Sequence, residues 1–312
     1  MKLKNEKLAP FLGAIAVIFA ASLWGVDGVV LTPRLYHLNV TVVVFLLHFV
    51  AFLIMTVFLF REIPKLKNIK KDEWASFFWI ALFGGAIGTM AITQALFLVN
   101  FEHLSAILIL QKLQPLFAIV LAAILLKEHP KKIFYAWAAL ALVGSYFLTF
   151  GFEQPLFDGN AMFIAALLSL LAAFAFGSST VFGKKVLEKT DFKTSTYVRF
   201  GLTSLIMIII VLLTGSFDGF YQVTIENILI VLLIAITTGG TAIFIYYWGL
   251  KRIMASKSTI YELSFPVTAI VLDYLINGSI MSGGQWFGAI IVIFSMIMIV
   301  RLRRNGNIIK KK

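Results

Sequence analysis

Two short polar stretches lie inside otherwise apolar segments of the sequence, and each ends in a proline. Residues 111–115 read Gln-Lys-Leu-Gln-Pro, and Glu262 precedes Pro266 by four positions. A charged side chain within a lipid-embedded helix costs about 2.5–3.5 kcal/mol, so such groups usually face a wet cavity or the interior of a helix bundle. Proline removes a backbone donor and interrupts the helix. These residue types predict a binding site for a small polar solute.

The candidate substrate-binding residues are the polar or aromatic side chains that fall within apolar segments. They are Trp24, Asp27, His48, Gln94, Gln111, Lys112, Tyr246, Trp248 and Glu262, with Pro115 and Pro266 expected to kink their helices. At a rise of about 1.5 Å per residue, both prolines fall near the middle of the membrane. Gln111 approaches that level from one side and Glu262 from the other, which predicts a central site.

Lys112 and Asp27 are open to two interpretations. Either Lys112 binds a carboxylate of the substrate while Asp27 holds or releases the lysine, or the two form a permanent ion pair that relieves burial. Glu262 is the candidate proton-coupling residue, because burial favours the neutral form of a carboxyl group. Its alternative role is that of a hydrogen-bonded structural acid. Arg199, aligned with His48, either lines the cavity or extends its charge to the membrane boundary.

The elements that must position these residues are membrane-spanning helices. The chain has 312 residues, of which 60% are hydrophobic and 13% charged, whereas soluble domains carry about 25% charge. One span with its connection takes about 30 residues, which predicts about ten spans. The apolar windows are Pro10–Val30, Val40–Phe60, Trp74–Leu98, Leu104–Leu126, Ile133–Phe150, Asn160–Gly183, Ser195–Thr214, Ile225–Leu250, Ser258–Ile276 and Gln285–Val300.

The basic residues predict the orientation. If the N-terminus lies in the cytoplasm, the cytoplasmic segments hold 24 of the 27 Lys and Arg, and the external connections hold only Arg34. This asymmetry follows the positive-inside rule and places both termini in the cytoplasm. The net charge of +12 is explained in the same way. We expect no nucleic-acid partner, since no basic groove with interleaved aromatic residues is evident.

The chain also aligns with itself at a shift of about half its length. A shift of 151 places Pro115 on Pro266 and Gln111 on Glu262, and a shift of 152 places Gly25 on Gly177. The division predicts a first half of residues 1–150 and a second half of residues 151–312, each with five spans. An odd number of spans forces the second half into the membrane upside down. Such inverted repeats are typical of secondary transporters.

These features resemble the EamA-domain branch of the drug/metabolite transporter superfamily over nearly the whole chain. The resemblance rests on residues 23–25 (Leu-Trp-Gly), the run from Ser105 through Pro115 to Glu128, residues 199–200 (Arg-Phe), the run from Ala255 to Pro266, and Gly288. Two positions depart from the family pattern: His48 stands in place of an arginine, and Ser279 in place of a second glutamate.

The resemblance implies a multi-pass carrier of the cell inner membrane that exports amino acids or related small metabolites by alternating access. We expect a monomer or homodimer with a small-molecule substrate in a lipid bilayer, no cofactor, no bound metal and no enzymatic activity. The sequence carries no phosphate-binding loop and no HExxH or GxSxG motif. Two alternatives are a broad exporter of lipophilic cations and a membrane protein that transports nothing. A solvated pocket bordered by Gln111, Lys112, Glu262 and Trp24 would favour a carrier.

Overall fold

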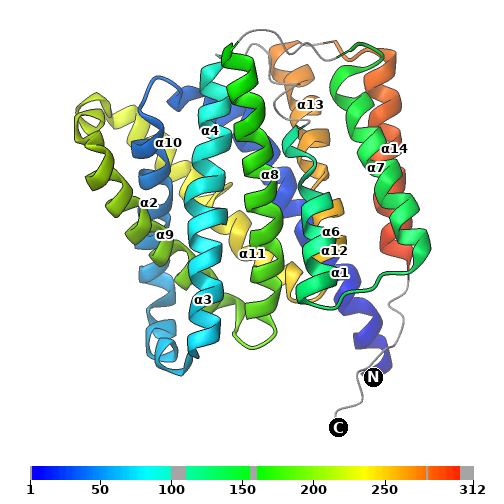
Figure 1. Ribbon diagram of the computed structural model, residues 1–312, viewed down its shortest axis with the longest axis horizontal. Helices are drawn as coiled ribbons and strands as arrows, with labels where there is room; N and C mark the ends of the chain where they lie inside the picture. The colour runs from blue at the N-terminus through cyan, green and yellow to red at the C-terminus, as the bar shows by residue number, and fades with distance from the viewer. Residues whose placement is uncertain (1, 100–109, 155–159, 279, 303–312) are drawn as a thin grey trace.

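The computed structural model describes residues 2–99, 110–154, 160–278 and 280–302, and the regular structure there is helical (Figure 1). Within these residues, nine helical segments are long and apolar enough to cross a membrane. The protein is therefore an all-helical multi-pass membrane protein. Large apolar side chains on the outside, such as Leu213 (82% exposed) and Phe58 (76%), suit contact with lipid.

The helices follow the chain in this order: α1 Lys2–Val26, α2 Val40–Leu59, α3 Lys71–Trp79, α4 Gly88–Leu98, α6 Gln114–Leu125, α7 Lys132–Phe150, α8 Asn160–Leu187, α9 Phe192–Thr214, α10 Ile225–Ile236, α11 Gly240–Leu250, α12 Ala255–Tyr261, α13 Ser264–Asn277 and α14 Gly283–Arg301. Wider π-helical turns continue α1 (η1, Asp27–Leu31) and join α3 to α4 (η4, Ile80–Ile87). Short 3-10 segments follow η1 (η2, Thr32–Leu35), α2 (η3, Phe60–Asn68) and α9 (η5, Ser216–Gln222).

The apolar windows of the sequence therefore coincide with helices of the structure. Only the window Leu104–Leu126 is described in part, because residues 104–109 lie outside the described part of the chain. The remainder includes α6, a shorter apolar helix. Helix starts follow the usual capping chemistry: Asn39 accepts a hydrogen bond from Thr41 N at the start of α2, and Ser282 forms a capping box with Gln285 at the start of α14.

The two ends of the bundle differ in charge. The connections 60–70, 126–131, 188–191 and 251–254 lie at one end, together with the start of α1 and the end of α14; we call this the basic end, and it is at the bottom of Figure 1. The connections 36–39, 151–154 and 215–224 lie at the opposite end, together with residues 278 and 280–282; we call this the far end. The basic end carries most of the Lys and Arg of the described connections.

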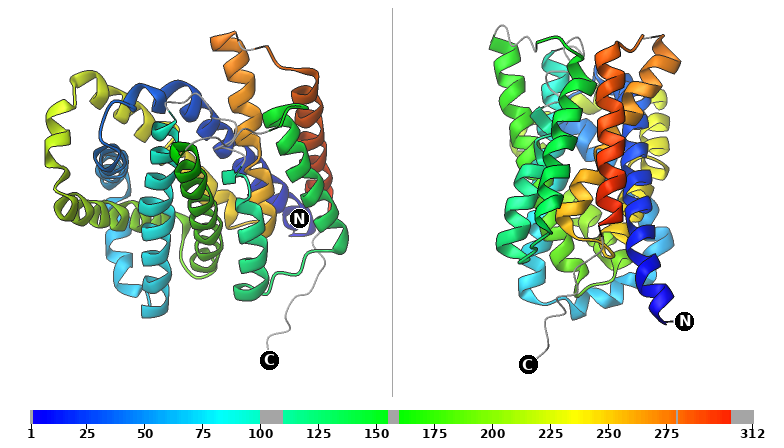
Figure 2. Two further views of the ribbon diagram at one scale, coloured as in Figure 1. Left: turned by 45° about the horizontal axis from the view of Figure 1, so that its top comes forward. Right: turned by 90° about the vertical axis from the view of Figure 1, so that its right-hand side faces the viewer.

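Helices from the two halves of the chain pack on one another. Helix α1 lies against α11 and α13, while α8 lies against α4 and α6. Two further pairs, α7 with α14 and α2 with α9, join one helix of each half. Figure 2 shows α7 and α14 running side by side along the bundle. Each half therefore completes its packing with helices of the other half.

Two glycines allow close approaches between helices of opposite halves. A β-carbon on Gly25 of α1 would lie 2.7 Å from Phe265 O of α13, and one on Gly177 of α8 would lie 2.8 Å from Gln114 O of α6. Any other residue would push the helices apart. These are the two glycines that the sequence aligned with each other, and each contacts the start of a helix in the opposite half.

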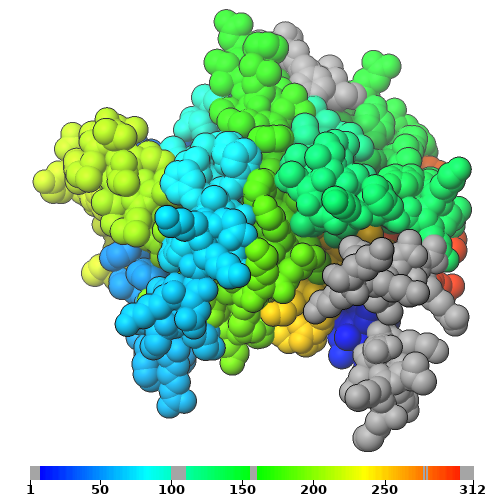
Figure 3. All heavy atoms as spheres, turned by 60° about the horizontal axis from the view of Figure 1, so that its bottom comes forward, coloured from blue at the N-terminus to red at the C-terminus, as the bar shows by residue number. Residues whose placement is uncertain are grey.

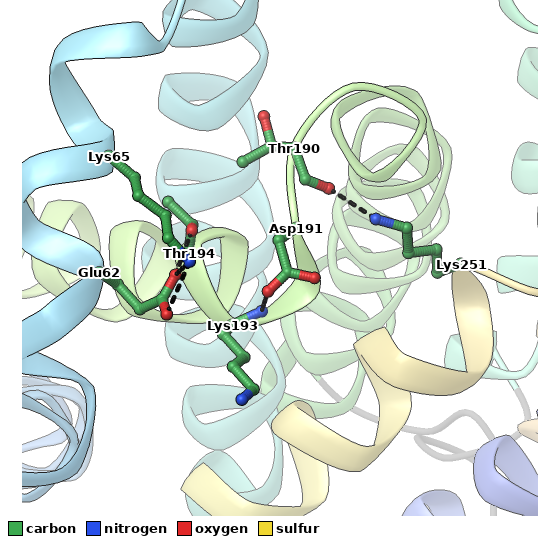
Figure 4. Close-up of polar contacts among 7 residues, drawn as sticks. All are labelled: Glu62, Lys65, Thr190, Asp191, Lys193, Thr194 and Lys251. Atoms are coloured by element: carbon green, nitrogen blue, oxygen red, sulfur yellow. Dashed lines mark hydrogen bonds and ion pairs between the residues drawn. The ribbon is translucent and has the colours of Figure 1, made fainter.

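Polar contacts join the halves at the basic end, which is turned toward the viewer in Figure 3. Glu128 accepts hydrogen bonds from Ala255 N (2.8 Å), Ser256 N (3.0 Å) and Ser256 Oγ (2.7 Å) and so caps α12. In Figure 4, Glu62 lies between Lys65 and Thr194, whose hydroxyl donates to it at 2.6 Å. The acidic side chains thus tie the first half to the second.

Further contacts order the α8–α9 and α11–α12 connections at the same end. Asp191 accepts a hydrogen bond from Lys193 N, and Lys251 Nζ donates to Thr190 O at 3.1 Å (Figure 4). Lys189 forms an exposed ion pair with Asp72 at 2.7 Å. The hydrogen bond from this ammonium to Asp72 raises the pKa of Lys189.

Candidate substrate cavity

Two helices are interrupted close to the middle of the bundle. A turn at residues 112–113 precedes α6, and a turn at residues 262–263 separates α12 from α13. Tighter hydrogen bonds replace the helical pattern there, from Leu113 N to Leu110 O (3.1 Å) and from Leu263 N to Ile260 O (3.1 Å). Pro115 and Pro266 lie just after these turns, where a proline needs no helical donor.

The interruptions border a cavity of about 750 Å³. Its walls reach Ile280 at the far end, which is 89% exposed, and extend inward to Thr259 and Arg199. The lining is mostly apolar, with a few converging polar groups, which is typical of small-molecule sites. Of the predicted residues, the lining includes Trp24, Asp27, His48, Gln111, Lys112, Pro115, Tyr246, Glu262 and Pro266.

Glu262 is held by both halves of the chain. Its carboxylate accepts hydrogen bonds from Gln114 Nε2 (2.6 Å), Tyr246 OH (2.7 Å) and Ser258 Oγ (3.2 Å). Gln111 Nε2 donates in turn to Gln114 Oε1 at 3.1 Å. A chain of hydrogen bonds therefore connects the two helix interruptions and uses both carboxylate oxygens of Glu262.

Lys112 and Asp27 both line the cavity, but they are not paired. The Lys112 ammonium donates to Thr149 Oγ1 at 2.7 Å, and the side chain is 3% exposed. No ion pair joins it to Asp27 or to another carboxylate among the residues that the structure describes. Asp27 Oδ1 is buried and accepts no hydrogen bond from the residues that the structure describes. The permanent ion pair considered from the sequence is absent from this structure.

Arg199 is buried within the bundle and lines the cavity, 8% exposed. Its guanidinium donates to Tyr247 OH (3.2 Å) and to Gly84 O (3.3 Å) and lies over the Tyr247 ring. Extension of its charge to the membrane boundary, the alternative weighed from the sequence, is therefore wrong. His48 also lines the cavity; its Nδ1 lies 2.9 Å from Val44 O, and its ring lies 5.6 Å from that of Phe200.

Two predicted residues lie elsewhere. Gln94 of α4 is half-buried but does not line the cavity. Trp248 of α11 is also absent from the lining, because its ring packs against the guanidinium of Arg252 at 3.6 Å. The polar lining residues that were not predicted from the sequence include Gln114, Ser179 and Thr238. The polarity of Gln114 within an apolar segment was the signal that could have identified it, whereas Ser and Thr occur too widely in helices to stand out.

No group of three or more His, Asp or Glu residues is arranged to hold a metal ion in the described ranges. What the site offers instead is hydrogen bonding and aromatic contact. Trp24 and Tyr246 lie with ring centroids 5.3 Å apart on the cavity wall. The chemistry of the cavity is that of non-covalent binding of an organic solute.

Membrane-length helices around a solute-sized cavity with interrupted helices are the architecture of secondary transporters. Sequence comparison agrees with this class. The chain belongs to the EamA-like transporter family, whose sequence signature matches residues 11–150 and again residues 163–301. The protein is therefore a membrane transporter with a small-molecule substrate rather than an enzyme, and the family resemblance stated from the sequence is confirmed.

Several relatives carry transporter names. The "Riboflavin transporter ImpX" of Fusobacterium nucleatum is 48% identical over 93% of this chain and 98% of its own length. The "Uncharacterized transporter YwfM" of Bacillus subtilis is 24% identical over 92% of this chain and 93% of its own length. A solved structure, described only as the crystal structure of a protein, superposes with a TM-score of 0.67 over 94% of this chain and 99% of its own, at 16% identity. The last comparison shows the fold alone.

Proposed function

We propose that this chain carries riboflavin, or a flavin of the same shape, across the membrane through the central cavity. The observation that carries the proposal is the cavity of about 750 Å³ in a chain 48% identical to a protein named as a riboflavin transporter. Cavities of about 300–1,000 Å³ suit drug-sized molecules. A flavin combines a flat aromatic ring, a carbonyl-rich pyrimidinedione edge and a hydroxyl-rich chain, so it needs aromatic walls and a few separate polar groups.

The internal hydrogen bonds of the cavity favour a neutral solute. Glu262 already accepts three hydrogen bonds, and Lys112 donates to Thr149. An amino acid would have to displace these partners from both groups. The unlike charges of Lys112 and Glu262 nevertheless support an amino acid or related solute as the second candidate. Export of the solute and proton coupling through Glu262 stay predictions.

We further propose that the chain consists of two inverted repeats of five spans, with both termini in the cytoplasm and the carrier in the cell inner membrane. The support is the double match of the family signature and the exchanged contacts of Gly25 and Gly177. The tenth span would comprise α6 and the segment before it. The basic end would then be cytoplasmic, in keeping with the positive-inside rule.

We propose alternating access as the transport mechanism. The cavity reaches the surface at the far end and stops at Thr259 and Arg199 toward the basic end. The structure would thus represent an outward-facing state, and release of the contacts of Glu128 and Glu62 would open the cytoplasmic side. The proposed carrier works as a monomer or homodimer, since the cavity is enclosed by one chain.

The test is transport by the purified protein in liposomes. Riboflavin, an amino-acid mixture and a lipophilic cation are offered separately in both directions, with and without an imposed pH gradient. We expect saturable movement of riboflavin, inhibited by excess unlabelled flavin. Movement of amino acids or the cation without flavin would overturn the proposal. A Glu262→Gln variant that keeps pH-dependent transport would refute coupling through this residue, and Glu153→Gln, on an exposed connection, serves as the control.

A further inference from the structure

Four buried polar atoms on residues that line the cavity have no hydrogen-bond partner among the residues that the structure describes. They are Asp27 Oδ1, Ser179 Oγ, Arg199 Nε and Thr238 Oγ1. Nearly all buried polar atoms in proteins are hydrogen-bonded. A buried polar atom without a partner costs about 1–3 kcal/mol. Their presence on the wall of one cavity suggests that a bound solute, or water that precedes it, supplies the missing partners.

Two of these atoms belong to an inner pair of donors. Ser179 Oγ lies 2.0 Å and Arg199 Nη2 3.6 Å from the position that a β-carbon would take on Gly84. Arg199 has no carboxylate within ion-pair distance among the described residues, and its two hydrogen-bond acceptors, Tyr247 OH and Gly84 O, are neutral. An unpaired guanidinium beside a hydroxyl favours an acceptor-rich group, such as ring carbonyls.

The other two atoms form an outer pair. Asp27 begins η1 directly after α1, and Thr238 lies in the interruption between α10 and α11. The hydroxyls of Thr32 and Thr238 lie beside the Asp27 carboxylate, but neither donates to Oδ1 in hydrogen-bond geometry. An ionised carboxylate only accepts hydrogen bonds, so this pair favours a group rich in hydroxyl donors. Asp27 leads into η2, whose Thr32 and Pro33 line the cavity toward the far end, whereas Arg199 lies toward the basic end.

We propose that these pairs are the two ends of one flavin subsite: Arg199 and Ser179 bind the carbonyl-rich pyrimidinedione edge, and Asp27 and Thr238 bind the hydroxyls of the ribityl chain. The ring then lies deepest, and the chain points to the mouth at the far end. The inference rests on the proposed function and adds the orientation of the substrate and the residues that distinguish its parts. Gly84 has a defined role, because any side chain there would collide with Ser179 in the inner pair.

The test compares riboflavin with lumiflavin, which keeps the ring system but has a methyl group in place of the ribityl chain. Binding to the purified full-length protein is measured by quenching of flavin fluorescence. We expect Arg199→Gln to weaken both ligands by about 10- to 100-fold, the effect of losing a hydrogen bond to a charged group. Asp27→Asn should weaken the binding of riboflavin by about tenfold and leave the binding of lumiflavin unchanged.

The controls separate folding from recognition. Arg252→Gln removes a guanidinium that packs on Trp248 outside the cavity lining and should change neither affinity. If Arg199→Gln does not fold, Ser179→Ala and Thr238→Val test the same two ends with smaller changes. Unchanged lumiflavin binding in the inner-pair variants, or equal losses for both ligands in the outer-pair variants, would overturn the orientation. Absence of riboflavin binding by the unmodified protein would instead overturn the proposed function together with the subsite.

Discussion

The two ends of the bundle are held together in different ways. At the basic end, three acidic side chains of the first half, Glu62, Asp72 and Glu128, bond to groups of the second half. At the far end, an apolar cluster with Val42 of α2 and Val231 of α10 joins the two halves. The closed end depends on directional bonds, whereas the end with the cavity mouth depends on contacts that tolerate sliding. In the proposed alternating-access cycle, the hydrogen bonds of the basic end are the contacts that would have to break.

The largest effect on transport is expected at Glu262, which lies between the two ends of the bundle. Glu262→Ala would leave Gln114, Tyr246 and Ser258 without their shared acceptor, at about 1–3 kcal/mol for each buried group. We expect transport in liposomes to fall by at least about 100-fold, with a lower melting temperature. Glu153→Ala is the matched control on an exposed connection. Normal transport by the Glu262→Ala variant would show that the hydrogen bonds of Glu262 between the two halves are not needed for transport.

Release of Glu128 should open the basic end selectively. Glu128→Ala removes three hydrogen bonds to the start of α12, and bonds to a charged group contribute about 1.5–3 kcal/mol each. The chain has no cysteine, so Thr259→Cys, at the inner end of the cavity, provides a single labelling site. We expect an impermeant thiol reagent applied at the basic end to label it about tenfold faster in the Glu128→Ala background.

The same labelling experiment can contradict the role of Glu128. Met281→Cys lies on the cavity wall near the far end and is the matched reporter for that side. Labelling there from the far side should not increase when Glu128 is removed. An equal rise at both sites would mean that the variant loosens the whole bundle rather than one end.

The contacts of Gly25 and Gly177 test whether the two halves pack on each other in an equivalent way. Gly25→Ala and Gly177→Ala each add a β-carbon less than 3 Å from a backbone oxygen of the opposite half. We expect each to lower the free energy of unfolding by about 1–3 kcal/mol, as overpacking does. Gly283→Ala, whose β-carbon would meet nothing within 4 Å, is the control. A large effect at only one of the two glycines would contradict the symmetric arrangement.

The smallest effect is expected at the exposed ion pair of Asp72 and Lys189. Its side chains are 54% and 51% exposed, and pairs of this kind contribute little. Asp72→Asn should change transport by less than about twofold. Because the hydrogen bond raises the pKa of Lys189 and lowers that of Asp72, the pair is present at neutral pH; it is lost as the pH rises through the pKa of Lys189 or falls through that of Asp72. A strong dependence of transport on this pair between pH 6 and 8 would contradict its minor role.

Much of this architecture was predictable from hydropathy and proline placement. The apolar windows coincide with the described helices, and the interruptions before Pro115 and Pro266 lie where the polar residues predicted them. The face that each helix turns inward was harder to predict. A helix that is apolar all round has little amphipathic signal. Gln94 and Trp248 were therefore assigned to the site although they lie outside it.

Arg199 shows a second limit of prediction from the sequence, which left its place open between the cavity and the membrane boundary. The apolar window was taken to begin at Ser195, but α9 begins at Phe192, so the side chain starts almost one turn further inside. Ser179 and Thr238 gave no signal in the sequence, because hydroxyl side chains are common in membrane helices and bond to their own backbone. Their importance comes from unused hydrogen-bonding capacity, which only three-dimensional neighbours reveal.

The exchanged packing of the halves has a consequence for how the protein is made. Lys112 finds its partner, Thr149, within the first half, so this charge can be satisfied early in synthesis. Gln114 bonds to Glu262, and α6 packs on α8. Glu262 and α8 belong to the second half, so the ribosome synthesises them after Gln114 and α6. After its insertion into the membrane, the first half therefore lacks the contacts of Gln114 and α6 until the second half has been synthesised. Insertion of the early helices and final assembly should be separate steps in biogenesis, joined when α12 and α13 arrive.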